Sequence, residues 1–117
     1  MRTLPLIDCC TPIGRPSLSE PEALDLERIF KALADRYRIK MVNMLAAAGA
    51  EPVCVCAFCD ALGLKQPTAS YHLKQLVEAG LLEREPRGTF AYYRLAPSAL
   101  ERVAGLLSAP LGLAEAI

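Results

Sequence analysis

Three closely spaced cysteines are the residues of this chain best suited to chemistry. Cys54, Cys56 and Cys59 lie within one short segment, and Cys9 and Cys10 form an adjacent pair near the start of the chain. Thiolate sulfur is the natural ligand of soft, thiophilic ions. The amino end of a short helix also favours the ionised, reactive form of a nearby thiol. The pattern therefore predicts a sulfur-based site for a metal or metalloid.

The spacing leaves two arrangements of this site open. On a continuous helix Cys56 and Cys59 share a face, whereas Cys54 and Cys56 point in nearly opposite directions. A site within the cluster therefore requires that Cys54 lie outside the helix or that the first turn unwind, and that strain is a candidate switch. In the second arrangement, Cys9 and Cys10 reach Cys56 or Cys59 of a second copy of the chain. The alternative to both is that the cysteines are small buried apolar residues.

The composition narrows the class of protein. The chain has 117 residues, of which 53% are hydrophobic and 22% charged, and its formal net charge is zero. These values predict one globular domain without a membrane span, with room for a locally basic face. Pro5 interrupts the first residues, so we expect no signal peptide and a cytoplasmic location. Five cysteines in that compartment predict free thiols or metal ligands rather than a disulfide framework. Because His72 is the only histidine, a metal site must be built mostly of sulfur.

Helical periodicity and turn residues predict the elements that position the cysteines. We expect one helix capped by Ser19, a second capped by Asp35, a short third helix over 53–61 and a fourth that begins at Gln66. Two strands should follow, over 81–83 and 90–93, joined by a turn at residues 86–88. A last helix is expected over 98–108.

This order of elements predicts a mainly α fold with a small β-hairpin, the winged helix-turn-helix, over residues 19–108. Residues 1–18 are expected to form a flexible arm that carries the cysteine pair, and 109–117 a C-terminal tail. The first and last helices carry more apolar residues than one small core needs, which predicts a homodimer through these helices. The residues of this apolar seam are Leu26, Ile29, Phe30, Leu33, Leu100, Val103 and Leu107.

The helix that begins at Gln66 is predicted to read DNA, because a helix-turn-helix places its second helix in the major groove. Its buried stripe is centred on Leu73 and Leu76, so the polar residues on its other faces are free to reach base edges or phosphates. We expect DNA contacts from Lys65, Gln66, Thr68, Ser70, Tyr71, Lys74 and Gln75. Arg87 at the hairpin tip should add a further contact, with Arg84 and Arg94 beside it. The alternative is that these residues form a solvent-exposed helix face with no DNA contact. The wing that follows the helix favours the DNA-binding interpretation.

Two stretches of the sequence resemble a known family. LGLKQPTASYHLKQLVEAGLLEREPRGTFAYYRL is similar to the recognition helix and wing of the ArsR/SmtB family of metal-sensing repressors. VCVCAFCDALGL resembles the arsenic-responsive members, whose short helix begins with the same Cys-Val-Cys-x-x-Cys arrangement. The resemblance covers roughly residues 20–108 and implies homodimerisation through the first and last helices. It also implies release of double-stranded operator DNA when trivalent arsenic or antimony binds cysteine thiolates, with three sulfurs around the ion. Some arsenic sensors of this family carry a paired-cysteine arm.

Other functions remain as alternatives. Zinc is less expected than arsenic or antimony, because the last helix lacks the His and Asp residues with which zinc-sensing relatives bind that ion, although zinc at the thiols stays open. A thiol redox or persulfide sensor of the same fold would use a reversible disulfide of Cys56 with Cys59, or an arm cysteine. A thiol oxidoreductase would need a strand-helix-strand context around these cysteines, which is missing here. The chain is therefore not expected to be an enzyme.

Overall fold

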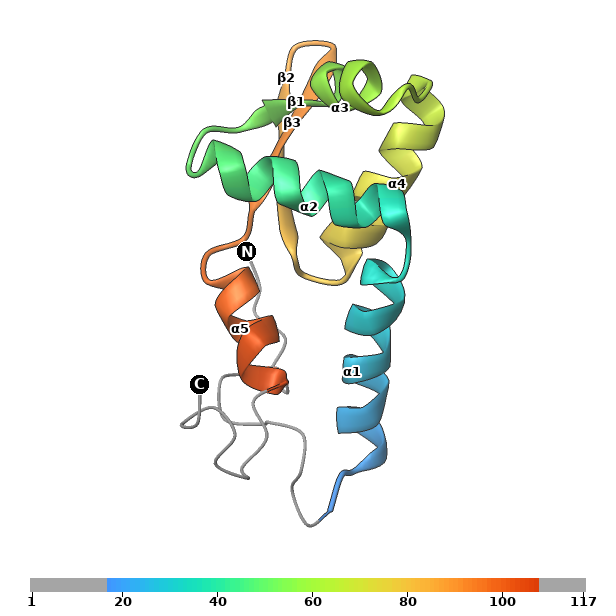
Figure 1. Ribbon diagram of the computed structural model, residues 1–117, viewed down its shortest axis with the longest axis vertical. Helices are drawn as coiled ribbons and strands as arrows, with labels where there is room; N and C mark the ends of the chain where they lie inside the picture. The colour runs from blue at the N-terminus through green and yellow to red at the C-terminus, as the bar shows by residue number, and fades with distance from the viewer. Residues whose placement is uncertain (1–16, 108–117) are drawn as a thin grey trace.

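A computed structural model describes residues 17–107 and shows five helices and three short strands in that range. In chain order they are α1 (Glu20–Leu33), α2 (Arg36–Ala48), β1 (Val53–Cys54), α3 (Val55–Leu62), α4 (Gln66–Glu78), β2 (Leu82–Arg87), β3 (Phe90–Leu95) and α5 (Ala99–Leu106). Helices α2, α3 and α4 surround one end of the small sheet, while α1 and α5 extend away from it (Figure 1). The predicted mainly α fold, with a helix-turn-helix followed by a β-hairpin, is confirmed.

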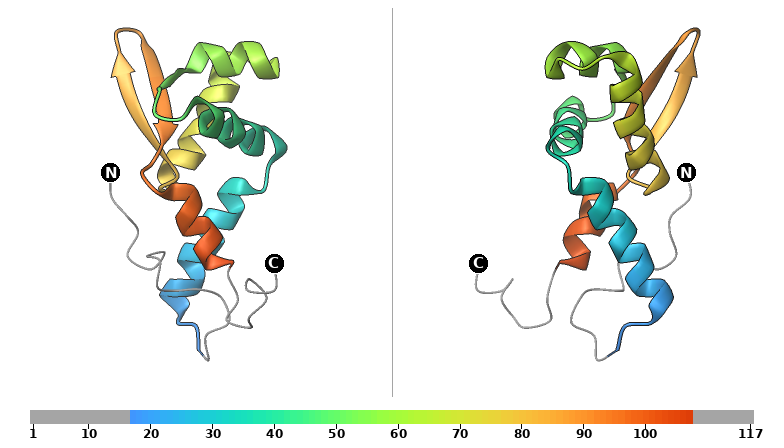
Figure 2. Two further views of the ribbon diagram at one scale, coloured as in Figure 1. Left: turned by 60° about the vertical axis from the view of Figure 1, so that its left-hand side comes forward. Right: turned by 90° about the vertical axis from the view of Figure 1, so that its right-hand side faces the viewer.

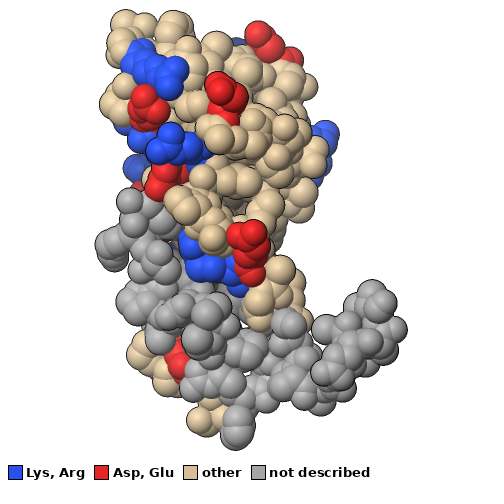
Figure 3. Space-filling view, turned by 90° about the vertical axis from the view of Figure 1, so that its left-hand side faces the viewer, with Lys and Arg blue, Asp and Glu red and all other residues tan. Residues whose placement is uncertain are grey.

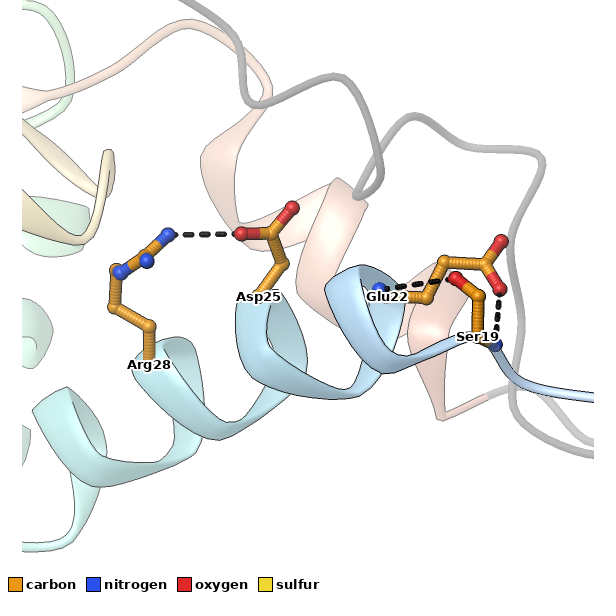
Figure 4. A network of polar contacts seen from close by, with 4 residues as sticks. All are labelled: Ser19, Glu22, Asp25 and Arg28. Atoms are coloured by element: carbon orange, nitrogen blue, oxygen red, sulfur yellow. Dashed lines mark hydrogen bonds and ion pairs between the residues drawn. The ribbon is translucent and has the colours of Figure 1, made fainter.

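The first two helices begin where their capping residues predict. Ser19 and Glu22 form a reciprocal capping box: the Ser19 Oγ accepts from the Glu22 N–H at 3.3 Å, and the Ser19 N–H donates to the Glu22 carboxylate at 2.8 Å (Figure 4). Asp35 accepts from the N–H groups of Tyr37 at 2.8 Å and Arg38 at 3.2 Å. Desolvation opposes ionisation of Asp35, but these hydrogen bonds outweigh it and hold the pKa of the carboxyl below its ordinary value of 3.8. Both caps therefore satisfy N–H groups that a helix leaves without a partner.

The sheet differs from the expectation in two places. Its antiparallel order is β1-β3-β2, and the short strand β1 pairs Cys54 with Tyr92 where a helix was expected to have begun already. The hairpin turn also lies later than expected, at Gly88 and Thr89, because β2 continues through Pro86. Pro86 is tolerated there since β2 is an edge strand, and Gly88 adopts the positive φ of +64° that the turn requires.

One apolar core joins the helix-turn-helix to the sheet. Its largest fully buried side chains include Phe58 of α3, Met41 and Leu45 of α2, and Leu73 and Leu76 of α4. Phe58 meets Tyr93 of β3 edge-on, with ring centroids 6.4 Å apart. Phe58 of α3 and the two leucines of α4 thus pack in one core, which joins the short helix to the helix that follows it.

A second apolar cluster, formed by Leu26 and Ile29 of α1, is contacted by Val103 of α5, and both helices lie at the end of the molecule away from the tip of the hairpin (Figure 2). Leu26 and Ile29 of the predicted seam are buried here and pack with Val103 inside one protomer. The large apolar side chains that remain exposed here are Leu24 (47%) of α1, Leu100 (41%) of α5 and Leu107 (59%), the residue that follows α5. Leu26 and Ile29 of the predicted seam are thus internal to the protomer, whereas Leu100 and Leu107, with Leu24 from outside the predicted set, form an outer apolar surface. Over residues 17–107, none of the helices is long and apolar enough to cross a membrane.

Candidate nucleic-acid interface and thiol cluster

Helix α4 presents its predicted DNA-reading residues on two faces. Gln66, Ser70 and Lys74 are spaced four residues apart and therefore lie in one row. They line a groove of about 400 Å³ between α4 and the wing, the hairpin of β2 and β3. Thr68 and Tyr71 lie exposed on a neighbouring face, and the Tyr71 side chain is 57% exposed.

Gln75 and Lys65 lie at the two ends of this surface. Gln75 is turned away from the wing and lines a hollow of about 580 Å³ with Arg28 and Arg38. Lys65 is the residue that precedes α4 and is exposed. The structure thus places Gln66, Ser70 and Lys74 on the face of α4 that is turned to the wing, Lys65 just before the helix, and Gln75 on a different face.

The wing contributes four residues to the groove: Arg84, Thr89, Ala91 and Tyr93. The strand register explains which arginine points where: Arg84 pairs with Tyr93, a core residue, so its side chain lies on the face of the hairpin directed at α4. Arg87 and Arg94 lie on the opposite face of the hairpin. Thr89 was missed by the sequence reasoning, because the turn was expected one position earlier and its place beside α4 depends on packing.

The basic residues of the wing are largely paired with carboxylates. The Arg87 guanidinium contacts Glu85 at 3.1 Å and lies 4.6 Å from the centre of the Tyr92 ring, and Arg94 contacts Glu83 at 3.0 Å. The hydrogen bond to Glu85 raises the pKa of Arg87 above its ordinary value. On the face shown in Figure 3, basic and acidic side chains are interleaved rather than gathered into one basic surface. Within the described residues neither Lys65 nor Arg84 forms an ion pair.

The start of α3 brings two of the cysteines together. Cys54 lies outside the helix, in β1, where its extended backbone makes it the N-cap and its sulfur accepts from the Cys56 N–H at 3.2 Å. The two Sγ atoms meet in a disulfide contact, with the Cα atoms 5.1 Å apart. One condition for a site within the cluster is thus met without unwinding α3: Cys54 is outside the helix. Cys59 is a free, partly exposed thiol three residues beyond Cys56.

A complete metal site is not assembled within the described part of the chain. No group of three or more His, Cys, Asp or Glu side chains lies close enough to hold an ion among residues 17–107. Cys9 and Cys10 lie outside the described residues, so the route through the arm stays a prediction. The donor set itself fits a soft trivalent ion, because Cys54 and Cys56 present adjacent sulfurs and need one more.

Cys54 also belongs to a row of side chains that crosses the sheet. It pairs with Tyr92 of β3, and Tyr92 in turn pairs with Glu85 of β2. Directly paired residues of an antiparallel sheet lie on the same face. The Tyr92 ring is covered by Arg87, which is also bonded to Glu85. The first thiol of the cluster is therefore connected through one tyrosine to the charged tip of the wing.

Comparisons with known proteins agree on one family. Residues 35–84 match the family described as bacterial regulatory protein, arsR family. The chain is 41% identical to the arsenical resistance operon repressor of Bacillus subtilis over 85 residues, which are 73% of this chain and 76% of that protein. It spans 60% and 58% of the length of two further curated relatives that it matches.

Two solved structures share the fold. One is the homodimeric winged helix-turn-helix DNA-binding domain of a possible ArsR-family regulator from Mycobacterium bovis, with a TM-score of 0.60 and 30% identity over 77% of this chain and 85% of that one. The other is the AntR antimony-specific transcriptional repressor, with a TM-score of 0.63 and 27% identity over 89% of this chain and 87% of that one. With its winged helix-turn-helix and its similarity to the B. subtilis repressor, the chain belongs to the arsR family of bacterial regulatory proteins.

Proposed function

We propose that the chain is a metalloid-responsive transcriptional repressor. As a homodimer in the cytoplasm it binds operator DNA, and it releases the DNA when trivalent arsenic or antimony binds its cysteine thiolates. The observation that carries this proposal is the position of the thiols: Cys54 and Cys56 meet at the start of α3, the helix that precedes the recognition helix α4 and shares its core. Relatives named as arsenical and antimony repressors support the class of effector.

DNA binding rests on the groove between α4 and the wing. Gln66 and Lys74 face it from the helix and Arg84 from the hairpin, so a phosphodiester backbone that runs through it meets cationic side chains from both elements. Replacing Lys74 or Gln66 with Ala should weaken operator binding by about 1–3 kcal/mol if the side chain reaches a base. Fluorescence anisotropy with operator DNA measures the change. Lys31→Ala, on α1, is the matched control. Full affinity of both α4 variants would place the interface elsewhere.

Glu85 is expected to compete with DNA for Arg87. The two side chains contact each other near the wing tip and are both about half exposed. A phosphate that approaches Arg87 must displace this carboxylate and is repelled by it. Glu85→Gln should therefore tighten operator binding about two- to fivefold at low salt. Glu83→Gln removes the same charge farther from the tip and is the control. Equal or weaker binding by the Glu85 variant would show that the wing tip stays away from the backbone.

Binding of the ion to the thiol cluster would cause the release of DNA. Once a thiol reductant has donated two electrons and opened the bond between them, Cys54 and Cys56 would hold the ion as two of three thiolate ligands. The third is either Cys59 or a cysteine of the arm, Cys9 or Cys10, from the partner. Cys54 is at once a ligand, the N-cap of α3 and a residue of β1. A bond from its sulfur to the ion removes the acceptor of the Cys56 N–H and pulls on both elements. Movement of α3 then displaces α4, to which it is packed.

A thiol redox sensor is the second candidate, and one observation favours it. Cys54 and Cys56 meet as a disulfide, whereas the earlier expectation paired Cys56 with Cys59. Oxidation of the two thiols by peroxide would form the S–S bond, with the two protons and two electrons taken up to give water. Arsenite added under anaerobic, fully reducing conditions separates the candidates. Release of DNA there supports the metalloid repressor, and release by peroxide alone supports the redox sensor.

A further inference from the structure

We infer that Arg38 is a positioning residue for DNA recognition: it ties the recognition helix α4 to α1 and so sets the spacing of the two half-sites that a dimer reads. This inference rests on the proposed binding of operator DNA. The observation behind it is a single guanidinium that bonds to both helices, from its own place in the first turn of α2.

The first bond joins Arg38 to the recognition helix. Its Nη1 lies 2.9 Å from Nδ1 of His72, the only histidine of the chain. A guanidinium has donors and no acceptor, so Nδ1 must accept. This bond spans 34 positions of sequence and is a tertiary contact made by a partly buried pair.

The second bond joins the same side chain to the end of α1. Arg38 Nε donates to the carbonyl of Ala32 at 2.7 Å. Ala32 lies in the last turn of α1, where the carbonyls have no partner within the helix. The guanidinium thus caps α1 and holds α4 at once. Its own backbone is fixed by Asp35, which accepts from the Arg38 N–H at 3.2 Å.

Aromatic contacts make His72 a firm anchor. Its ring lies 5.9 Å from the Tyr37 ring of α2 and 5.5 Å from the Tyr71 ring, measured between centroids. Tyr71 is the residue that precedes His72 in α4 and belongs to the predicted DNA-reading set. The His72 ring therefore contacts Arg38 and Tyr37 of α2 and Tyr71 of its own helix. A displacement of the ring should also disturb Tyr71, whose side chain is exposed on α4.

The position of the two joined helices gives this link a function. Helix α1 carries part of the exposed apolar surface that is free to meet a second copy, including Leu24, whereas α4 faces the groove beside the wing. In a dimer that reads two half-sites about one helical turn apart, the angle between these helices determines the distance between the two recognition helices. Loss of the link should let α4 tilt, so that affinity falls for the best-spaced operator and much less for badly spaced ones.

The test uses full-length protein and an operator that the wild type selects from randomised duplex DNA, with the spacer then lengthened or shortened by one base pair. Arg38→Met and His72→Phe should each weaken binding to the best spacing about tenfold and flatten the spacing preference. Lys40→Met is the matched control. Lys40 lies two residues further along the same helix α2 and is exposed, so this change removes one positive charge of α2 away from the His72 ring and should keep the wild-type preference.

Two further variants test the hydrogen bond itself. His72→Asn offers an amide oxygen close to the place of Nδ1 and should restore part of the spacing preference that His72→Phe loses. The double variant Arg38→Met/His72→Phe should bind no worse than Arg38→Met alone, because Arg38→Met has already lost the bond to His72. His72→Phe keeps an aromatic ring between the tyrosines, so it remains informative if Arg38→Met does not fold.

Three results would overturn the inference. An equal loss at every spacing, with a smaller dependence of affinity on salt, would make Arg38 a direct phosphate contact. An equal loss at every spacing with a lowered thermal midpoint would make it a purely structural residue. Wild-type affinity in both Arg38→Met and His72→Phe would show that Arg38 has no role in DNA recognition. Failure of the wild type to enrich any DNA sequence would instead overturn the proposed function, and the positioning role with it.

Discussion

Cys56→Ser is expected to bind operator DNA as tightly as the wild type and to keep it bound at arsenite concentrations that release the wild-type protein. Cys56 is exposed on α3, meets Cys54 across the start of the helix and shares a helical face with Cys59. It therefore fits both arrangements of the proposed site, the one within the cluster and the one that receives the partner's arm. Two remaining sulfurs of the cluster hold a three-coordinate ion poorly. Repression should survive because Cys56 lies off the recognition helix and serine is nearly isosteric.

Anisotropy of labelled operator, titrated with arsenite under anaerobic reducing conditions, measures this loss of response. Cys54→Ser should lose the response as Cys56→Ser does, and Cys59→Ser, Cys9→Ser and Cys10→Ser identify the third ligand. If Cys59→Ser also loses the response, the site lies at the start of α3, and if Cys9→Ser or Cys10→Ser does, it bridges the arm and the helix. Cys54→Ser should still fold, because a serine hydroxyl caps a helix at least as well as a thiol. A Cys56→Ser protein that releases DNA at wild-type arsenite concentrations would refute the assignment.

The second large effect is expected from the outer surface of α1 and α5. Leu24→Glu combined with Leu100→Glu places two carboxylates on the exposed apolar surface of these helices, where they should prevent a second copy from packing. Neither side chain belongs to the cluster of Leu26 and Ile29, so the protomer should still fold. Without the dimer, each half-site is bound alone and affinity for a palindromic operator should fall at least about a hundredfold.

Sedimentation at micromolar concentration and operator titration together test this expectation. Ile39→Glu is the control, because Ile39 is an equally exposed apolar residue (56%) on α2 rather than on α1 or α5. The double variant should sediment as a monomer and the control as a dimer. A monomeric double variant that still binds the palindrome with wild-type affinity would show that dimerisation is not what holds the protein on DNA.

Local features of this protein were determined by the sequence itself. Ser19 and Asp35 begin α1 and α2 as expected, since a capping side chain needs only the next three residues to do its work. The helical spacing of apolar residues located α4, and with it the helix-turn-helix and the wing. The cluster of cysteines was likewise visible as a set of soft ligands. All of these depend on neighbours within one or two turns of the same helix.

The contacts that connect the cysteines and the DNA-reading residues to the rest of the fold depend on the tertiary structure. Cys54 lies outside α3 because its backbone pairs with Tyr92, a residue 38 positions later that no local pattern links to it. The hairpin register directs Arg84 toward α4 and Arg87 away from it. Arg38 meets His72 only when α1, α2 and α4 have packed together. Periodicity determines which face of an element is buried, whereas the partners of a polar side chain depend on elements far along the chain, whose relative positions are set by packing of the whole core.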